Sequence, residues 1–145
     1  MIQRIQTVYL LLTTLAGILF LTGNILYFSD GSSVSFSGVS AGIEVEKNWL
    51  LSVLMAGIPL ISFITIFLYR KRKLQMKLIG FLITLIVIVV LFLGFYSFRT
   101  INKSDTSLIF NYRILIPLLM LIFSFLALRG IRKDEEIVRS YDRLR

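Results

Sequence analysis

Few residues of this sequence could carry out covalent or acid-base chemistry. The chain has no Cys and no His, which excludes thiolate nucleophiles, disulfides, iron-sulfur clusters and imidazole metal sites. All eight acidic residues lie outside the long apolar runs, so no buried carboxylate is expected to carry a proton across a membrane. Catalysis would depend on Asp, Glu, Lys, Tyr or Ser in loops. We therefore predict a protein that is not an enzyme and has no metal or other cofactor.

Three residues inside the apolar runs are candidate intramembrane or lipid-contact residues. Arg113 either anchors a short helix by extending its guanidinium to the membrane surface, which we favour, or is buried and binds a lipid headgroup or a partner carboxylate. Pro59 and Pro117 each remove one helical hydrogen bond and are expected to kink their helices. The two proline segments resemble each other, which permits an internal repeat, but kinked packing helices without a ligand are the preferred interpretation.

The elements that position these residues are apolar helices. Of the 145 residues, 57% are hydrophobic and 17% are charged, and the mean hydropathy is +0.85. Charge-free runs cover residues 5–29, 48–69, 78–98 and 114–128, and the first three are long enough to cross roughly 30 Å of hydrocarbon at about 1.5 Å per residue. We predict an all-α membrane protein, an up-down bundle of four transmembrane helices with spans near 5–28, 49–69, 78–98 and 108–128.

The positive charges predict the orientation. Only four of the 16 basic residues (Lys47, Arg99, Lys103 and Arg113) fall on one side of the predicted bundle, which leaves twelve on the other. The positive-inside rule then predicts a bacterial inner-membrane protein with both termini in the cytoplasm. The acidic residues divide equally, so the net charge of +8 lies on the inner side. We expect it to contact anionic lipid headgroups and not nucleic acid.

The segments outside the spans have distinct patterns. In the outer loop, 29–48, residues 33–37 and 43–46 alternate between polar and apolar types, and Gly38 and Gly42 bracket the segment between them, which predicts a short β-hairpin. Residues 70–77 form a cytoplasmic loop. The tail, 129–145, is expected to continue the fourth helix into the cytoplasm, with Gly130 as a possible hinge.

Polar motifs at the predicted inner face carry a resemblance to a known family. The opening MIQRIQ, the segment Arg72-Lys73-Leu74-Gln75 and the closing KDEEIVRSYDRLR resemble a family of uncharacterised four-span bacterial membrane proteins with a domain of unknown function. The resemblance extends over essentially the whole chain. It implies four helices in the inner membrane, and it implies no activity, substrate or catalytic residue.

These motifs also form the predicted docking surface. We expect a non-enzymatic accessory or assembly subunit whose cytoplasmic face binds a membrane-protein partner or a second copy of the chain. The alternative is a small-solute transporter or a lipid-binding protein that uses the kinked helices 2 and 4. The candidate docking residues are Gln3, Arg4, Gln6, Arg72, Lys73, Gln75, Asp134, Glu135, Arg139, Asp142 and Arg143.

Overall fold

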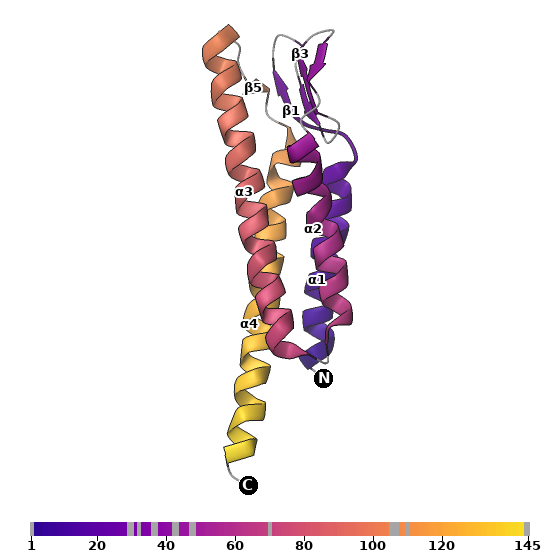
Figure 1. Ribbon diagram of the computed structural model, residues 1–145, viewed down its shortest axis with the longest axis vertical. Coiled ribbons are helices and arrows are strands. Elements are labelled where there is room, and N and C mark those ends of the chain that lie inside the picture. Colours follow the sequence, from indigo (N-terminus) through magenta and orange to yellow (C-terminus); the bar gives the residue numbers. More distant parts are fainter. Residues whose placement is uncertain are drawn as a thin grey trace.

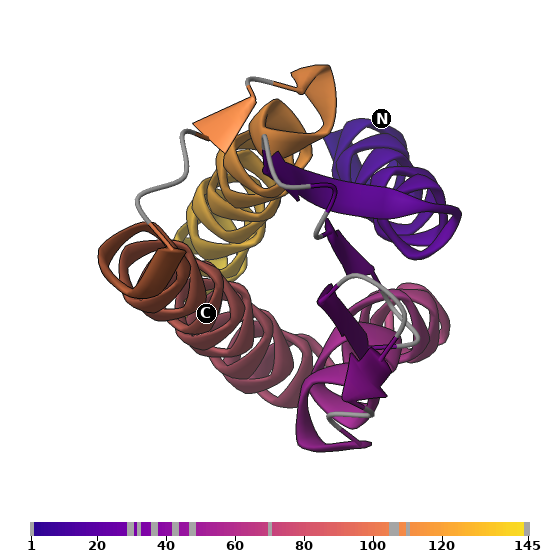
Figure 2. The ribbon, with the colours of Figure 1, turned by 90° about the horizontal axis from the view of Figure 1, so that it is seen from above.

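The computed structural model describes residues 2–28, 31, 33–35, 38–41, 44–46, 49–69, 71–104, 108–109 and 111–143. Four α-helices form the body of the described chain: α1 (Ile2–Leu21), α2 (Trp49–Phe67), α3 (Arg72–Ser104) and α4 (Leu115–Arg143). Seen from above, they lie around a ring in chain order, with α4 returning to the side of α1 (Figure 2). Successive helices run in opposite directions, so α1 begins and α4 ends at the same end of the bundle (Figure 1).

Three of the helices contain stretches that are long and apolar enough to cross a membrane. These stretches are Trp49–Phe67, Arg72–Arg99 and Tyr112–Val138. The apolar part of α1, Ile5–Leu21, is shorter. At about 1.5 Å per residue its 17 residues extend roughly 26 Å, a few ångströms less than a typical hydrocarbon core.

A small sheet stands at the end of the bundle opposite the termini (Figure 1), which we call the outer end. It contains β1 (Asn24–Phe28), β2 (Ser33–Ser35), β3 (Gly38–Ala41), β4 (Glu44–Glu46) and β5 (Leu108–Ile109), in the order β4-β3-β2-β1-β5. All four pairings are antiparallel. Because β5 precedes α4, the sheet joins the α1–α2 connection to the α3–α4 connection.

The structure corrects the predicted course of the outer segment. Hairpin pairing is present, but β2 pairs with β3, and β3 pairs with β4, so residues 33–35 do not pair with 44–46 as predicted. Gly38 begins β3 instead of bracketing a turn. Residues 36, 37, 42 and 43 lie outside the described part of the chain.

The helix bounds also differ from the predicted spans. Helix α1 ends at Leu21 and not near residue 28, because the apolar residues that follow form β1. Helix α4 begins at Leu115 and not near 108, since β5 and a 3₁₀ turn, η1 (Tyr112–Ile114), precede it. Helix α3 extends beyond 78–98 at both ends. The expected continuation of the last helix into the tail is confirmed, and α4 runs without a break through Gly130.

Two apolar clusters fill the bundle, and a layer of buried hydroxyls lies between them. The larger cluster includes Phe20, Ile58 and Met120, and the smaller includes Leu10 and Ala127. Along α1, α2 and α4 the hydroxyls fall between these positions or close to them: Thr13, Thr14, Ser62, Thr65 and Ser124 are all buried. The side chains that face outward from the same helices are mainly Leu, Ile, Val and Phe.

Candidate functional site

At the outer end, Arg113 connects the segment before α4 to the end of α1. Its Nη1 donates a hydrogen bond to the carbonyl oxygen of Thr22, which follows the last residue of α1. Carbonyls at a helix C-terminus lack intrahelical partners and carry partial negative charge, so a guanidinium there is favourable. The Arg113 guanidinium also lies 5.9 Å from the ring centroid of Tyr112. Arg113 is therefore a capping residue for α1, a role that neither sequence interpretation included.

Gly23 gives the Arg113 side chain the space that this contact requires. Its φ is +131°, a conformation that side chains rarely adopt, and a Cβ there would overlap the Arg113 guanidinium. Two amides strengthen the same junction, as Asn111 Nδ2 donates to the Asn24 carbonyl (3.3 Å) and Asn24 Nδ2 donates to Ser33 Oγ (3.1 Å). These hydrogen bonds join the segment after α1 to β2 and to the residue before η1.

The two prolines occupy different positions in their helices. Pro59 is the eleventh residue of α2 and packs against Gly17 of α1, where a Cβ would approach the Pro59 ring to 3.2 Å. Pro117 is the third residue of α4, within the first turn, where its missing N–H has no intrahelical partner to lose. The predicted kink of a span at Pro117 is therefore wrong. The Arg113 carbonyl, to which a proline at position 117 cannot donate, accepts from the Leu115 N–H.

At the inner end, polar residues from three distant segments meet. Gln6 Nε2 donates to Asp134 Oδ2 at 2.7 Å, and Arg72 Nη1 lies 3.4 Å from the Asp134 carbonyl oxygen. Gln75 Nε2 donates to the Thr65 carbonyl at 3.3 Å. Gly130 allows this approach, because a Cβ on it would lie 3.0 Å from Gln6 Cγ. We call this set of contacts the inner polar network.

Burial divides the predicted docking residues into two groups. Gln6, Gln75 and Asp134 are each at most 8% exposed, and their side chains make contacts within the chain. Arg72, Lys73 and Glu135 instead line a surface groove of about 360 Å³ together with Lys71 and Leu74. Gln3, Arg4, Arg139, Asp142 and Arg143 belong to α1 or α4, but their side chains lie outside the described part. Three residues predicted to contact a partner therefore hold the bundle together instead.

Of the buried hydroxyls described in the middle of the bundle, all but one have a hydrogen-bond partner. Ser62 Oγ donates to the Leu10 carbonyl at 3.0 Å, and the Thr14 hydroxyl lies within hydrogen-bond distance of both that carbonyl and Ser62 Oγ. Ser124 Oγ is fully buried and has no hydrogen-bond partner among the described residues. No three Asp or Glu side chains in the described ranges come together as metal ligands.

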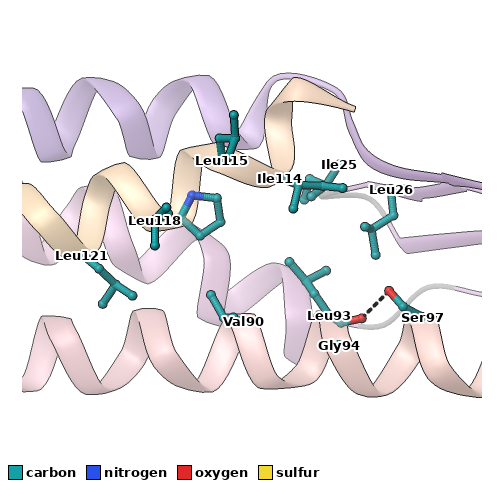
Figure 3. Close-up of a pocket in the computed structure, with 11 residues that line it drawn as sticks. Ile25, Leu26, Val90, Leu93, Gly94, Ser97, Ile114, Leu115, Leu118 and Leu121 are labelled. Carbon is teal, nitrogen blue, oxygen red and sulfur yellow. Dashed lines mark hydrogen bonds between the residues drawn. The ribbon is translucent and has the colours of Figure 1, made fainter. Parts of the chain in front are cut away.

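A cavity of about 470 Å³ lies between α3 and α4, below β1 and beside Pro117 (Figure 3). Among the described lining residues one hydroxyl is present, that of Ser97, and it donates to the Leu93 carbonyl of its own helix at 2.9 Å. The lining residues are Ile25, Leu26, Val90, Leu93, Gly94, Ser97, Ile114, Leu115, Pro117, Leu118 and Leu121.

The cavity is lined mainly by apolar side chains, and it is not a closed void. Leu115 and Leu118 are 53% and 55% exposed, so the cavity opens to its surroundings. Of the three candidate lipid-contact residues, Pro117 lines this cavity, and no pattern in the sequence indicated its other walls.

Three helices in the described part of the chain have the length and apolar composition of membrane spans, as in helical membrane proteins. Residues 2–144 match the family described as a domain of unknown function (DUF4293), and the chain belongs to that family. The resemblance of the polar motifs to a family of unknown function is thereby confirmed at this level. No curated protein and no solved structure matches the chain.

Proposed function

We propose that the chain crosses the bacterial inner membrane four times, and that α1 is a span in addition to α2, α3 and α4. Helix α1 packs along both α2 and α4 and therefore lies at the same depth as they do (Figure 1). Its outward-facing residues include Val8, Leu11 and Leu15, each about half exposed and spaced by three or four positions. Such a stripe is stable against lipid tails and unfavourable in water.

The ends of the helices agree with this placement. Trp49 at the start of α2 is 74% exposed, and Tyr69, just after its end, is 54% exposed. Twenty residues separate them, about 30 Å along a helix, which equals the usual hydrocarbon thickness with an aromatic residue at each interface. The basic segment 71–77 lies at the inner end of the bundle, where α1 begins and α4 ends. The positive-inside rule assigns that end of the bundle to the cytoplasm.

Single cysteines test the topology directly, because the chain contains none. Tyr112→Cys and Glu136→Cys place a thiol at an exposed position of the outer and inner ends, respectively. A membrane-impermeant maleimide should label Tyr112→Cys in intact cells and Glu136→Cys only after permeabilisation. Labelling of both positions in intact cells, or of Glu136→Cys alone, would contradict the proposed orientation.

We further propose a non-enzymatic accessory or assembly subunit that docks a membrane-protein partner at the cytoplasmic end. The supporting observation is the convergence of separate polar segments at that end: Arg72 and Lys73 from α3 share a groove with Glu135 from α4. Helix α4 also continues beyond the other three helices at this end (Figure 1). The exposed side chains on this projecting part include Lys133, Glu136 and Val138.

The proposed docking surface differs from the one drawn from sequence alone. The docking surface proposed from the structure consists of the groove and the part of α4 after Asp134. Asp134 itself, Gln6 and Gln75 support that surface from inside, since they hold α4 to α1 and the start of α3 to the end of α2.

Affinity purification in mild detergent tests the docking proposal. We compare the full chain with a chain ending at Asp134 and with Lys71→Glu/Lys73→Glu, which reverses two groove charges. Lys77→Glu is the matched control, because it reverses one exposed charge of the same helix outside the groove. A docked partner should be lost from the first two variants and retained by the control. Equal recovery from all four proteins at equal abundance would refute this role.

The cavity between α3 and α4 favours a second candidate function, lipid binding, over transport of a polar solute. A polar solute would lose its hydration there without gaining hydrogen bonds, since the one hydroxyl in the lining is already satisfied by Leu93. The kinked-helix route for a solute also loses support, because Pro117 lies in the first turn of α4.

A further inference from the structure

We propose that the cavity between α3 and α4 holds an acyl chain of an anionic phospholipid whose phosphate lies at Arg113. This inference rests on the membrane placement and the lipid-binding candidate proposed above. It adds the class of lipid, the position of its two ends and the residues that select it.

The cavity walls suit a hydrocarbon chain. On α3 the lining residues Val90, Leu93, Gly94 and Ser97 recur at intervals of three and one, so they form one face of the helix. Ligand cavities in proteins measure roughly 300–1,000 Å³, and this one, at about 470 Å³, falls in that range. Water is a poor occupant, because a stable buried water needs two or more polar partners and the walls do not supply them.

The cavity lies at the depth of the outer half of the bilayer. The α3 residues on other faces at the same level, Leu91, Phe95 and Phe98, are each more than 60% exposed, as expected for side chains that face lipid tails. Gly94 is exposed at the rim, and a Cβ on it would meet no atom within 4 Å. The opening beside Gly94 therefore gives a lipid chain access from the bilayer without a path through water.

Arg113 is not itself a lining residue, but it places a positive charge next to chain segments that line the outer end of the cavity. It directly precedes the lining residue Ile114, and its guanidinium lies against Gly23, two residues before the lining residue Ile25. Nη1 donates to Thr22, while Nε and Nη2 have no hydrogen-bond partner among the described residues. An arginine presents five N–H donors in a geometry that suits phosphate, so the donors left over complement an anionic headgroup.

The test uses the purified full chain in nanodiscs that contain a phospholipid with a photoreactive diazirine on its acyl chain. The probe is offered as phosphatidylglycerol or as phosphatidylcholine, and the labelled peptides are mapped by mass spectrometry. Gly94→Leu and Val90→Phe each add volume at the opening. Gly80→Leu is the matched control, because Gly80 lies in the same helix, has the same open space around its Cβ position and does not line the cavity.

We expect labelling of peptides 90–97 and 114–121 to fall about tenfold in both filling variants, equivalent to about 1.4 kcal/mol of binding free energy, and to be unchanged in Gly80→Leu. Arg113→Gln should lower labelling by phosphatidylglycerol to the level seen with phosphatidylcholine, and Arg113→Lys should retain the preference. Thermal stability in the same nanodiscs is measured for every variant, so that loss of fold is distinguished from loss of lipid.

Three outcomes would overturn the proposal. Labelling spread evenly over all four helices would show that the protein lies in the membrane but that its cavity does not bind lipid. This outcome would not contradict the proposed topology. Equal labelling in Gly94→Leu, Val90→Phe and wild type would exclude the cavity as the site. Equal labelling by both headgroups in the wild type would exclude the proposed selection of an anionic lipid by Arg113. The cysteine-labelling experiment fails independently if the topology itself is wrong.

Discussion

Substitution of Gly23 by Ala is expected to destabilise the protein more than any other glycine-to-alanine change at its outer end. Two physical costs combine at this position. A side chain at φ +131° stores about 1–3 kcal/mol of backbone strain. The new Cβ also displaces the Arg113 guanidinium from the Thr22 carbonyl, and the loss of a hydrogen bond to a charged group costs about 1.5–3 kcal/mol. The sum is about 2.5–6 kcal/mol.

Gly31 supplies the control that separates the two costs. Its φ is +81°, and an added Cβ would meet nothing within 4 Å, so Gly31→Ala should cost only the backbone strain, about 1–2 kcal/mol. In an Arg113→Met background the cost of Gly23→Ala should fall to its backbone part. The two substitutions should therefore show a coupling energy of about 1.5–3 kcal/mol in a double-mutant cycle.

Unfolding in mixed micelles, followed by far-ultraviolet circular dichroism as the denaturing detergent increases, measures these free energies. The single tryptophan, Trp49, begins α2 near the sheet and gives a second signal from the outer end. If Gly23→Ala costs no more than Gly31→Ala, or if its cost is the same with and without Arg113, then the guanidinium does not cap α1 and the reasoning is refuted.

Three further substitutions test the packing of the bundle by the same unfolding measurement. Asp134→Ala leaves the buried Gln6 amide without its acceptor and should cost about 1.5–3 kcal/mol, and a cost near zero would show that the inner polar network is not stabilising. Gly17→Leu forces α1 away from Pro59 and should cost about 1–3 kcal/mol, whereas wild-type stability would contradict the close approach. Ser124→Ala removes a buried hydroxyl without a partner and should stabilise by about 1 kcal/mol, and a loss of stability would reveal a partner for that hydroxyl.

The hydrophobic content of the sequence predicted four helices. It could not locate the residue at which α1 ends. The run 5–29 contains no charge, and residues 25–28 satisfy a membrane helix and a buried strand equally well. The stop signal was present in Thr22, Gly23 and Asn24, since glycine and asparagine commonly follow the last turn of a helix. Ile25 and Leu26 are then buried in the sheet at the outer end and not in a longer span.

The start of α4 was missed for a related reason. Treating 108–128 as a span required Arg113 to lie inside the helix. Asn111 is a good N-terminal cap, its side chain accepts from the Arg113 N–H, and Pro117 favours a first turn. Together these residues indicate a helical segment that begins just after Asn111 and not near residue 108. Their combined signal was available in the sequence but was outweighed by the need for a longer apolar run.

The inner end shows which part of a site sequence reasoning can reach. Polar motifs at the cytoplasmic ends of separate helices were expected to share one face, and the structure brings Gln6, Arg72 and Asp134 into contact. Which of them face solvent depends on side-chain pairing across helices, and no single-sequence pattern encodes that pairing. A buried amide and a buried carboxylate satisfy each other here, so neither remains available to a partner.

The links at the outer end also explain why the cavity lies between α3 and α4. Arg113 binds the end of α1, Asn111 binds Asn24, and β5 pairs with β1, so the start of α4 is held on the side of α1. None of these three links includes a residue of α3. We therefore expect the outer half of α3 to be the wall that shifts when a chain enters and the α1–α4 side to stay fixed. A lipid in the cavity should consequently slow amide exchange in α3 between Val90 and Ser97 more than in α1, and the reverse order would place the mobile wall elsewhere.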